Sequence, residues 1–330
     1  MSSTLQAAAI RETSIAVIGA GSWGANHIRE LVNLGALHTV VDSDTVQLSR
    51  VTGLYPEVQV TTQLTDVINS EIQGVVVATP PSTHYALAKA LIQAKKDVLV
   101  EKPLALSHRE ALDLVGLAQK HQIVLATGHL LEYHPMIQKL ISKVRAGVIG
   151  DLHYLSSNRL NFGRFRTYEN VFQSFAPHDV GLILRLSQAL PSKINYVEKS
   201  TNDGRPADIA LTNLWFESGL QAHIFVSWLN PVKDHRFVAV GETGFLTADG
   251  VTNTLRQYIG RHSDAAETTP PKVELVEELA FAQSNPLKTE LQDFLSCIKS
   301  RAEPLSSPRL GADVVGVIDA CLQQAQQNTS

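Results

Sequence analysis

A glycine-rich turn near the N-terminus carries the most specific chemical signal in the chain. Four apolar residues, Ile15 to Ile18, run directly into a stretch with the spacing G-x-G-x-x-G. This pattern is typical of a buried parallel strand that ends in a tight turn and opens a helix. Backbone N–H groups at the start of such a helix, together with its dipole, favour a pyrophosphate. The turn therefore predicts a dinucleotide site, with contacts from Gly19, Gly21, Ser22, Trp23 and Gly24.

An acidic residue follows at the end of the next predicted strand. Residues 25–34 are expected to form a helix and residues 37–41 a strand that ends at Asp42. Asp42 lies 18 positions beyond Gly24, near the roughly 20 at which a carboxylate accepts the hydroxyls of the adenosine ribose. A carboxylate there also repels a 2′-phosphate, so the sequence favours NAD over NADP. The alternative is that Asp42 only ends the strand or caps a helix.

Helical and extended patterns alternate as far as residue 126, which predicts an α/β fold with a doubly wound parallel sheet. Ligands of such sheets bind beyond the carboxyl ends of the strands. The glycine turn, Asp42, the pair Thr79-Pro80 and the run Glu101-Lys102-Pro103 all fall at such ends. We therefore expect these residues to serve one site.

Two motifs in this half resemble those of a known family. They are Ala78-Thr79-Pro80-Pro81-Ser82-Thr83-His84 and Val100-Glu101-Lys102-Pro103, and they are similar to motifs of the glucose–fructose oxidoreductase/inositol dehydrogenase/MocA (Gfo/Idh/MocA) family. The resemblance implies a Rossmann domain, here residues 1–128, with Lys102 beside the nicotinamide and in contact with the hydroxyl being oxidised. It also implies that Thr79, Pro80, His84 and Glu101 border the cofactor. The position of Lys102 alone fits a solvated lysine at the end of a strand, before a proline, as well as it fits a catalytic residue.

The pattern changes in the second half of the chain. After Gly128–Pro135 and a predicted helix at 136–146, period-two strands follow. Short turns at Glu217-Ser218-Gly219 and Glu242-Thr243-Gly244 predict an antiparallel sheet. Residues 129–330 are therefore expected to form an α+β domain with an open, mainly antiparallel sheet. In the family, such a sheet joins subunits, which implies a homo-oligomer, a dimer or tetramer, and a role of this domain in binding substrate.

An arginine-rich segment stands out in this half, with three arginines in eight residues. Arginine forms bidentate contacts with phosphate, and neighbouring aromatic rings can stack on a base. The segment is therefore predicted to bind the diphosphate and uridine of a nucleotide sugar. The alternatives are an exposed loop of solvated arginines or a salt-bridge patch between subunits. The residues predicted to bind substrate are Tyr133, Arg159, Asn161, Arg164, Arg166, Asn170, Ser174 and His178.

His178 is the candidate general base. Pro177 suits the first position of a helix, so His178 is expected in the first turn, where the helix dipole disfavours imidazolium. A neutral histidine is suited to accept a proton near pH 7. The alternative is a histidine satisfied by local capping bonds. The family places an aspartate four residues before its catalytic histidine; here that residue is Ser174, so an Asp–His relay is not implied.

Residues 157–179 are most similar to the nucleotide-sugar dehydrogenases of the family. This resemblance implies NAD-dependent oxidation of UDP-N-acetylglucosamine at C3, by His178 and Lys102, to a 3-keto sugar for a partner aminotransferase of lipid A biosynthesis. Two further substrate classes stay open, UDP-N-acetylglucosaminuronate and a free polyol or sugar. A non-catalytic NAD-sensing protein is the alternative outside the enzymes.

The amino-acid composition limits the classes of protein to which this chain can belong. With 330 residues, 44% of them hydrophobic and 18% charged, the chain is typical of a two-domain globular enzyme. A net charge of −4 argues against general nucleic-acid binding. Cys297 and Cys321 fit buried thiols of a reducing compartment. The sequence has no bilayer-length apolar run, signal peptide or Cys/His metal pattern. We therefore expect a cytoplasmic protein without a metal or membrane contact, and a mobile tail at residues 1–12.

Overall fold

The computed structural model describes residues 13–163, 165–167, 169–202, 204–261 and 272–329. The tail predicted at 1–12 and the candidate Arg164 lie outside these ranges. The chain divides into two compact units, Met1–Tyr133 with Asn285–Val315 and His134–Ser284 with Gly316–Ser330. The C-terminal part of the chain thus contributes to both units. The division of labour predicted for residues 1–128 and 129–330 stays a prediction.

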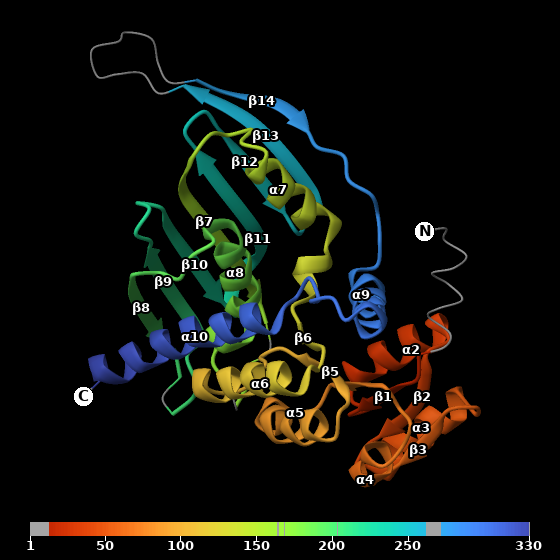
Figure 1. The fold of residues 1–330 in the computed structure, drawn as a ribbon. Coiled ribbons are helices and arrows are strands. Elements are labelled where there is room, and N and C mark those ends of the chain that lie inside the picture. Colours follow the sequence, from red (N-terminus) through yellow and green to blue (C-terminus); the bar gives the residue numbers. More distant parts are fainter. Residues whose placement is uncertain (1–12, 164, 168, 203, 262–271, 330) are drawn as a thin grey trace. The chain divides into compact units, whose positions relative to one another are not determined.

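A six-stranded parallel sheet forms the centre of the first unit (Figure 1). Its strands in spatial order are β3 (Gln59–Thr61), β2 (Leu37–Val41), β1 (Ile15–Ile18), β4 (Gly74–Val77), β5 (Asp97–Glu101) and β6 (Leu125–Gly128). Every neighbouring pair runs parallel. The chain winds outward in one direction through β2 and β3 and then in the other from β4, so the ends of β1 and β4 form the switch point. The predicted doubly wound sheet is confirmed.

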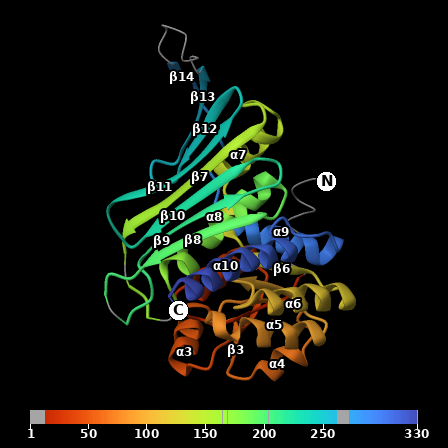
Figure 2. The same cartoon turned by 90° about the vertical axis from the view of Figure 1, so that its left-hand side faces the viewer.

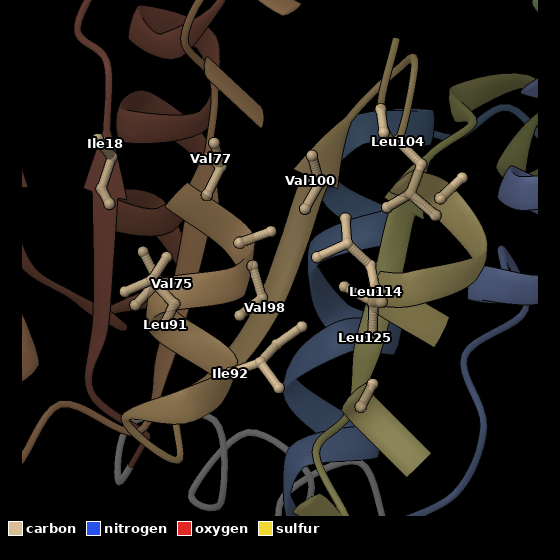
Figure 3. Packing of buried hydrophobic residues seen from close by; sticks show 14 of the residues in the cluster. Ile18, Val75, Val77, Leu91, Ile92, Val98, Val100, Leu104, Leu114 and Leu125 are labelled. Carbon is tan, nitrogen blue, oxygen red and sulfur yellow. The ribbon is translucent and has the colours of Figure 1, made fainter. Parts of the chain in front are cut away.

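Helices cover both faces of this sheet. Helices α4 (Leu64–Ile68), α5 (His84–Gln93) and α6 (His108–His121) lie on one face, and α2 (Gly24–Leu34), α3 (Thr45–Leu54) and α9 (Pro286–Ser300) on the other. On the first face, Leu91 and Leu114 pack with Val75 and Val98 of the sheet (Figure 3). Because both faces are covered, the central strands β1 and β4 are buried along their whole length and are almost continuous apolar runs in the sequence, whereas the edge strand β3 is more exposed.

An eight-stranded sheet forms the second unit (Figure 2). In spatial order its strands are β14 (Lys272–Glu278), β13 (Thr254–Arg261), β12 (Gly244–Asp249), β11 (Leu229–Gly241), β7 (Leu152–Phe162), β10 (Gln221–Ser227), β9 (Ile209–Trp215) and β8 (Lys193–Lys199). Among the described strands, β7 and β10 pair in parallel and the other neighbours are antiparallel. The predicted open, mainly antiparallel sheet is confirmed, although strands β13 and β14 were not expected.

Three helices complete the second unit. Helix α7 (Pro135–Arg145) contacts β12 and β13, and α8 (Val171–Ser187) contacts β7, β9 and β10. The last helix, α10 (Pro308–Thr329), belongs to both units. Its second half meets β8 through Gln324, whose Oε1 accepts the Tyr196 N–H at 2.5 Å. The helix expected at 136–146 is therefore present as α7.

Helix α8 begins earlier than the sequence indicated. The Asn170 side chain accepts the Gln173 N–H at 2.8 Å, and the Gln173 side chain accepts the Asn170 N–H at 3.1 Å. This capping box starts the helix at Val171. Pro177 therefore lies inside the helix and does not start it. The expectation that His178 occupies the first turn and feels the N-terminal dipole was wrong.

A buried carboxylate ties the returning C-terminal segment to the sheet of the first unit. Asp97, only 5% exposed, starts β5. Its Oδ1 accepts the Val124 N–H at 2.7 Å, and its two oxygens lie 2.6 and 2.9 Å from the two terminal nitrogens of Arg301. The guanidinium thus supplies the counter-charge for a carboxylate that is removed from water.

Replacement of Arg301 by methionine is expected to destabilise the first unit by about 2 kcal/mol, because Asp97 would stay buried without its counter-charge. Urea unfolding followed by circular dichroism measures the loss. The matched control is Arg29→Met, since Arg29 is exposed and its contacts with Glu30 and Asn26 lie within its own helix; it should change stability by less than about 0.5 kcal/mol. Equal losses in both variants would contradict the assignment.

Candidate functional site

The glycine turn joins β1 to α2 at the switch point of the first sheet. Gly19 has φ +96°, a value that favours glycine. A Cβ on Gly24 would lie 1.9 Å from the Gly19 carbonyl oxygen, and one on Gly19 would lie 2.6 Å from the Ala78 oxygen. The ideal Cβ of Gly21 has no heavy atom within 4 Å among the described residues. The first and third glycines are thus required by the fold, while Gly21 leaves room for a ligand to approach the backbone.

Asp42 supports this turn from the end of β2. Its Oδ2 accepts the Ala20 N–H at 2.6 Å, and its Oδ1 accepts the N–H of Asp44, the N-cap of α3, at 2.9 Å. The carboxylate is partly exposed, and each of its oxygens has a second lone pair. Asp42 can therefore hold the turn and still accept a hydroxyl of the adenosine ribose. The turn and this carboxylate together fit NAD.

His84 ties the loops after β4 and β5 together. Its ring is 1% exposed, with Nδ1 2.7 Å from the Pro103 carbonyl oxygen and Nε2 2.9 Å from that of Thr79. Both ring nitrogens are therefore engaged by backbone carbonyls, so His84 positions the two loops. Thr79 is partly buried and Pro80 exposed, and both stay predicted cofactor contacts.

Lys102 directly follows β5, and Glu101 is the last residue of that strand. The Glu101 Oε2 accepts the Lys102 N–H at 3.2 Å. Its Oε1 lies 2.6 Å from His27 Nε2 and accepts a hydrogen bond from the indole N–H of Trp23. Burial by itself raises the pKa of Glu101, but the contacts with His27, Trp23 and Lys102 outweigh it and hold that pKa below its usual range. Glu101 is therefore an anion.

A second carboxyl group, on Glu290 of α9, lies in the same unit. Glu290 is 1% exposed, and among the described residues neither carboxyl oxygen has a hydrogen-bond partner. Burial raises the pKa of Glu290 well above its usual range, and the charges of Glu101 and Asp293 raise it further. The pKa values of the two carboxyl groups are therefore shifted in opposite directions, because a second buried charge in the same unit would be costly.

Tyr133 is also buried within this unit, at 4% exposure. Its hydroxyl donates to Asp293 Oδ2 at 2.7 Å and accepts the Ser306 N–H at 3.2 Å. Burial, reinforced by the Asp293 charge, raises the pKa of Tyr133. The tyrosine hydroxyl thus already has a donor and an acceptor inside the unit, and its predicted contact with substrate remains untested.

In the second unit, Arg159 of β7 pairs with Asp179 of α8. The Arg159 Nε and Nη2 atoms lie 2.8 and 2.9 Å from the two Asp179 oxygens, and Ser157 donates to Oδ1 at 2.8 Å. The Asp179 side chain is 4% exposed. Asp179 thus fixes the direction of the Arg159 guanidinium and neutralises part of its charge. Asp179 was not expected as a site residue; its position directly after His178 was the available signal.

The other candidates of this unit lie around the start of α8. The Arg166 Nη1 atom lies 2.5 Å from Glu169 Oε1, and Asn170, the N-cap, donates to Glu198 at 2.8 Å. Asn161 lies near the end of β7. Ser174 is buried, and His178, one turn further along α8, is partly buried. Asn170 thus caps the helix that carries Ser174 and His178.

His235 of β11 lies opposite Arg159 in the sheet. Burial, with the positive charges of Arg159 and Lys233, lowers the pKa of His235 to about 4. The imidazole is therefore neutral at physiological pH. It was not expected as a site residue, and only the strand register brings it to Arg159.

Comparisons with known proteins define the class. The model of an oxidoreductase family with an NAD-binding Rossmann fold, Gfo/Idh/MocA, matches residues 13–129. A UDP-N-acetylglucosamine 3-dehydrogenase of Acidithiobacillus ferrooxidans is 30% identical over 86% of this chain and 87% of that protein. Inositol 2-dehydrogenase 2 of Paenarthrobacter aurescens is 31% identical over 74% of this chain and 68% of that protein.

Solved structures agree with these matches. A structure of UDP-N-acetylglucosamine 3-dehydrogenase from A. ferrooxidans has a TM-score of 0.82 and 27% identity, and the match covers 95% of this chain and 97% of that one. The chain belongs to the Gfo/Idh/MocA oxidoreductase family. The expectations of an NAD-dependent dehydrogenase and of NAD as its cofactor are confirmed.

In the part of the chain that the structure describes, no group of three or more His, Cys, Asp or Glu residues could hold a metal ion. No described helix has the length and apolar character to cross a membrane. Cys297 and Cys321 are buried free thiols, and burial raises the pKa of each to about 12.

The two roles of the glycines lead to a prediction. Gly24→Ala should lower the melting temperature, because the new Cβ overlaps the Gly19 carbonyl. Gly21→Ala should keep the melting temperature but weaken NADH binding about tenfold or more, because the methyl group stands where the pyrophosphate approaches. Thermal unfolding and NADH fluorescence titration measure the two effects. The control is Gly53→Ala in α3, whose Cβ position is also open. If Gly21→Ala bound NADH as the parent does, the site would lie elsewhere.

Proposed function

We propose that this chain oxidises the C3 hydroxyl of UDP-N-acetylglucosamine with NAD, giving the 3-keto sugar for a following aminotransferase. The observation that carries the proposal is the 30% identity, over 86% of the chain, to a UDP-N-acetylglucosamine 3-dehydrogenase. Lys102 at the carboxyl end of β5, beside the NAD-binding turn of its unit, supports a reaction at that site.

In the first unit, the glycine turn and Asp42 hold the cofactor, and Thr79 and Pro80 border it. Bound NAD supplies a hydride acceptor at C4 of the nicotinamide. The Lys102 ammonium group stabilises the negative charge that develops on the substrate oxygen as its proton leaves. Alignment of the C3–H bond with the cofactor supplies much of the remaining acceleration.

In the second unit, His178 accepts the proton of the C3 hydroxyl. Arg159, Arg164 and Arg166 bind the diphosphate, and Asp179 keeps the Arg159 guanidinium in one orientation. Tyr133, Asn161, Asn170 and Ser174 are further residues that we propose bind the substrate. A guanidinium held by a carboxylate loses little conformational freedom when it binds a ligand, which favours affinity.

The open face of the second sheet is proposed to join subunits into a dimer or tetramer. Apolar side chains stand on strands at one end of this sheet, with Val197 51% and Leu211 41% exposed. Burial of such side chains against a second copy would be favourable. We place the enzyme in the cytoplasm, where NAD and nucleotide sugars are available.

The function is tested by following NADH formation with a panel of substrates. The panel contains UDP-N-acetylglucosamine, UDP-N-acetylglucosaminuronate, UDP-glucose and myo-inositol, with the product trapped by an aminotransferase and identified by mass. The highest kcat/KM is expected for UDP-N-acetylglucosamine. A preference for myo-inositol would reassign the enzyme to free polyols, a result that the inositol dehydrogenase relative makes informative. No turnover with any member would favour an NAD sensor.

Lys102→Ala is expected to lower kcat by a factor of about 100 or more, because the developing alkoxide loses its positive partner. NADH binding should change little, since the turn and Asp42 are intact. Steady-state kinetics and NADH titration separate the two effects. Lys139→Ala on α7 is the control for removal of one positive charge. Normal turnover by Lys102→Ala would overturn the catalytic assignment.

Arg166→Ala is expected to raise the KM for a UDP-sugar by about tenfold and to leave the KM for NAD unchanged, because one charge-assisted contact with the diphosphate is lost. Initial-rate measurements with each substrate varied in turn test this. The control is Arg145→Ala at the exposed end of α7. An unchanged KM for the UDP-sugar would show that Arg166 serves only its ion pair with Glu169.

A further inference from the structure

Three N–H donors converge on the Glu101 carboxylate. The Oε1 atom meets the Trp23 indole N–H and, at 2.6 Å, His27 Nε2, while Oε2 accepts the Lys102 N–H. The His27 side chain is 0% exposed and that of Glu101 12%. A carboxylate so far removed from water is stable only with such donors. The contacts therefore hold Glu101 in one orientation.

The two donors to Oε1 come from the cofactor end of α2. Trp23 lies in the glycine turn, between Gly21 and Gly24, and His27 stands four residues later on the same side of the helix. Their rings meet edge to face, with centroids 6.2 Å apart. The turn that receives the pyrophosphate is thus bonded, through one side chain, to the end of strand β5.

The neighbouring strand leaves space for this arrangement. Gly128 of β6 pairs with Glu101 across the sheet. A Cβ at Gly128 would lie 2.9 Å from Glu101 Oε2. Glycine here allows the carboxylate to lie close against β6, between the turn and the Lys102 N–H.

We propose that the Glu101 carboxylate couples occupation of the NAD turn to the position of Lys102, with Trp23 and His27 as positioning residues. The inference rests on the role proposed above for Lys102. A ligand that fixes the turn fixes the Trp23 indole and, through Glu101, the backbone N–H of Lys102. His84, bonded to Pro103, holds the same loop from its other side. Lys102 is thereby oriented by contacts on both flanks.

A double-mutant cycle on NADH affinity tests the coupling. Trp23→Phe keeps an aromatic ring but removes the indole donor, and it is expected to raise the Kd of NADH about tenfold. In a Glu101→Met background, the same change should alter the Kd by less than about twofold, because its acceptor is gone. Equal effects of Trp23→Phe in both backgrounds would overturn the proposal, as would an unchanged Kd in the single variant.

His27 provides a second test that does not depend on how well Glu101→Met folds. His27→Gln places an amide N–H near the position of Nε2, whereas His27→Leu removes the donor. We expect His27→Leu to raise the Kd of NADH and lower kcat while the KM for the sugar is unchanged, and His27→Gln to restore both. If the role of His27 were purely structural, His27→Leu would lower the melting temperature without changing the Kd of NADH and kcat at constant sugar KM. The same conclusion would follow if His27→Gln were as impaired as His27→Leu.

The result can be read separately from the proposed function. NADH titration needs no sugar, so the cycle gives its answer even if no member of the substrate panel is oxidised. If the two substitutions had additive effects on the binding free energy of NADH while UDP-N-acetylglucosamine was oxidised normally, only the coupling would be ruled out. If the effects were not additive and no sugar was oxidised, the coupling would be supported and the proposed substrate would be ruled out.

Discussion

The close approach of backbone atoms at the glycine turn is the constraint on which the first unit depends. Because Gly24 has no Cβ, helix α2 can begin against the Gly19 carbonyl, and because Gly19 has none, the turn can lie against the end of β4. The direction of α2 then determines where Trp23 and His27 point. Those two side chains meet Glu101, which in turn accepts the Lys102 N–H. A single packing condition thus links cofactor binding to the residue proposed for catalysis.

In the second unit, a capping box and a buried carboxylate fix the position of helix α8. The capping box of Asn170 and Gln173 fixes the start of α8, and the Asp179 carboxylate locks that helix onto β7 through Ser157 and Arg159. The charges of Arg159 and Asp179 therefore offset each other between the sheet and the helix without a bound ligand. The phosphate that we propose binds Arg159 would meet a guanidinium of fixed direction, with its positive charge partly offset by Asp179.

Much of the first unit was predictable because most of its strands are buried on both faces and end in distinctive turns. The runs Ile15–Ile18 and Gly74–Val77 are typical of short buried strands. The contacts of Glu101 were not predictable, since His27 lies 74 positions away and only the sheet order brings the two together. Pro177 was misread as a helix start because a proline is tolerated inside α8, where the capping box had already begun the helix. Strand β14 was not predicted, although Lys272 to Leu275 alternate polar and apolar residues; all residues of this strand are exposed, so neither of its faces contributes to the core.

Transfer of hydrogen from C3 is the central claim, and isotopic labelling tests it most directly. UDP-N-acetylglucosamine deuterated at C3 should pass its deuterium to NAD, so that the mass of the reduced cofactor rises by one deuterium. The transfer should also be slower than with the unlabelled sugar. Unlabelled NADH, with the deuterium retained in the sugar product, would show that oxidation occurs at another carbon and would contradict the account.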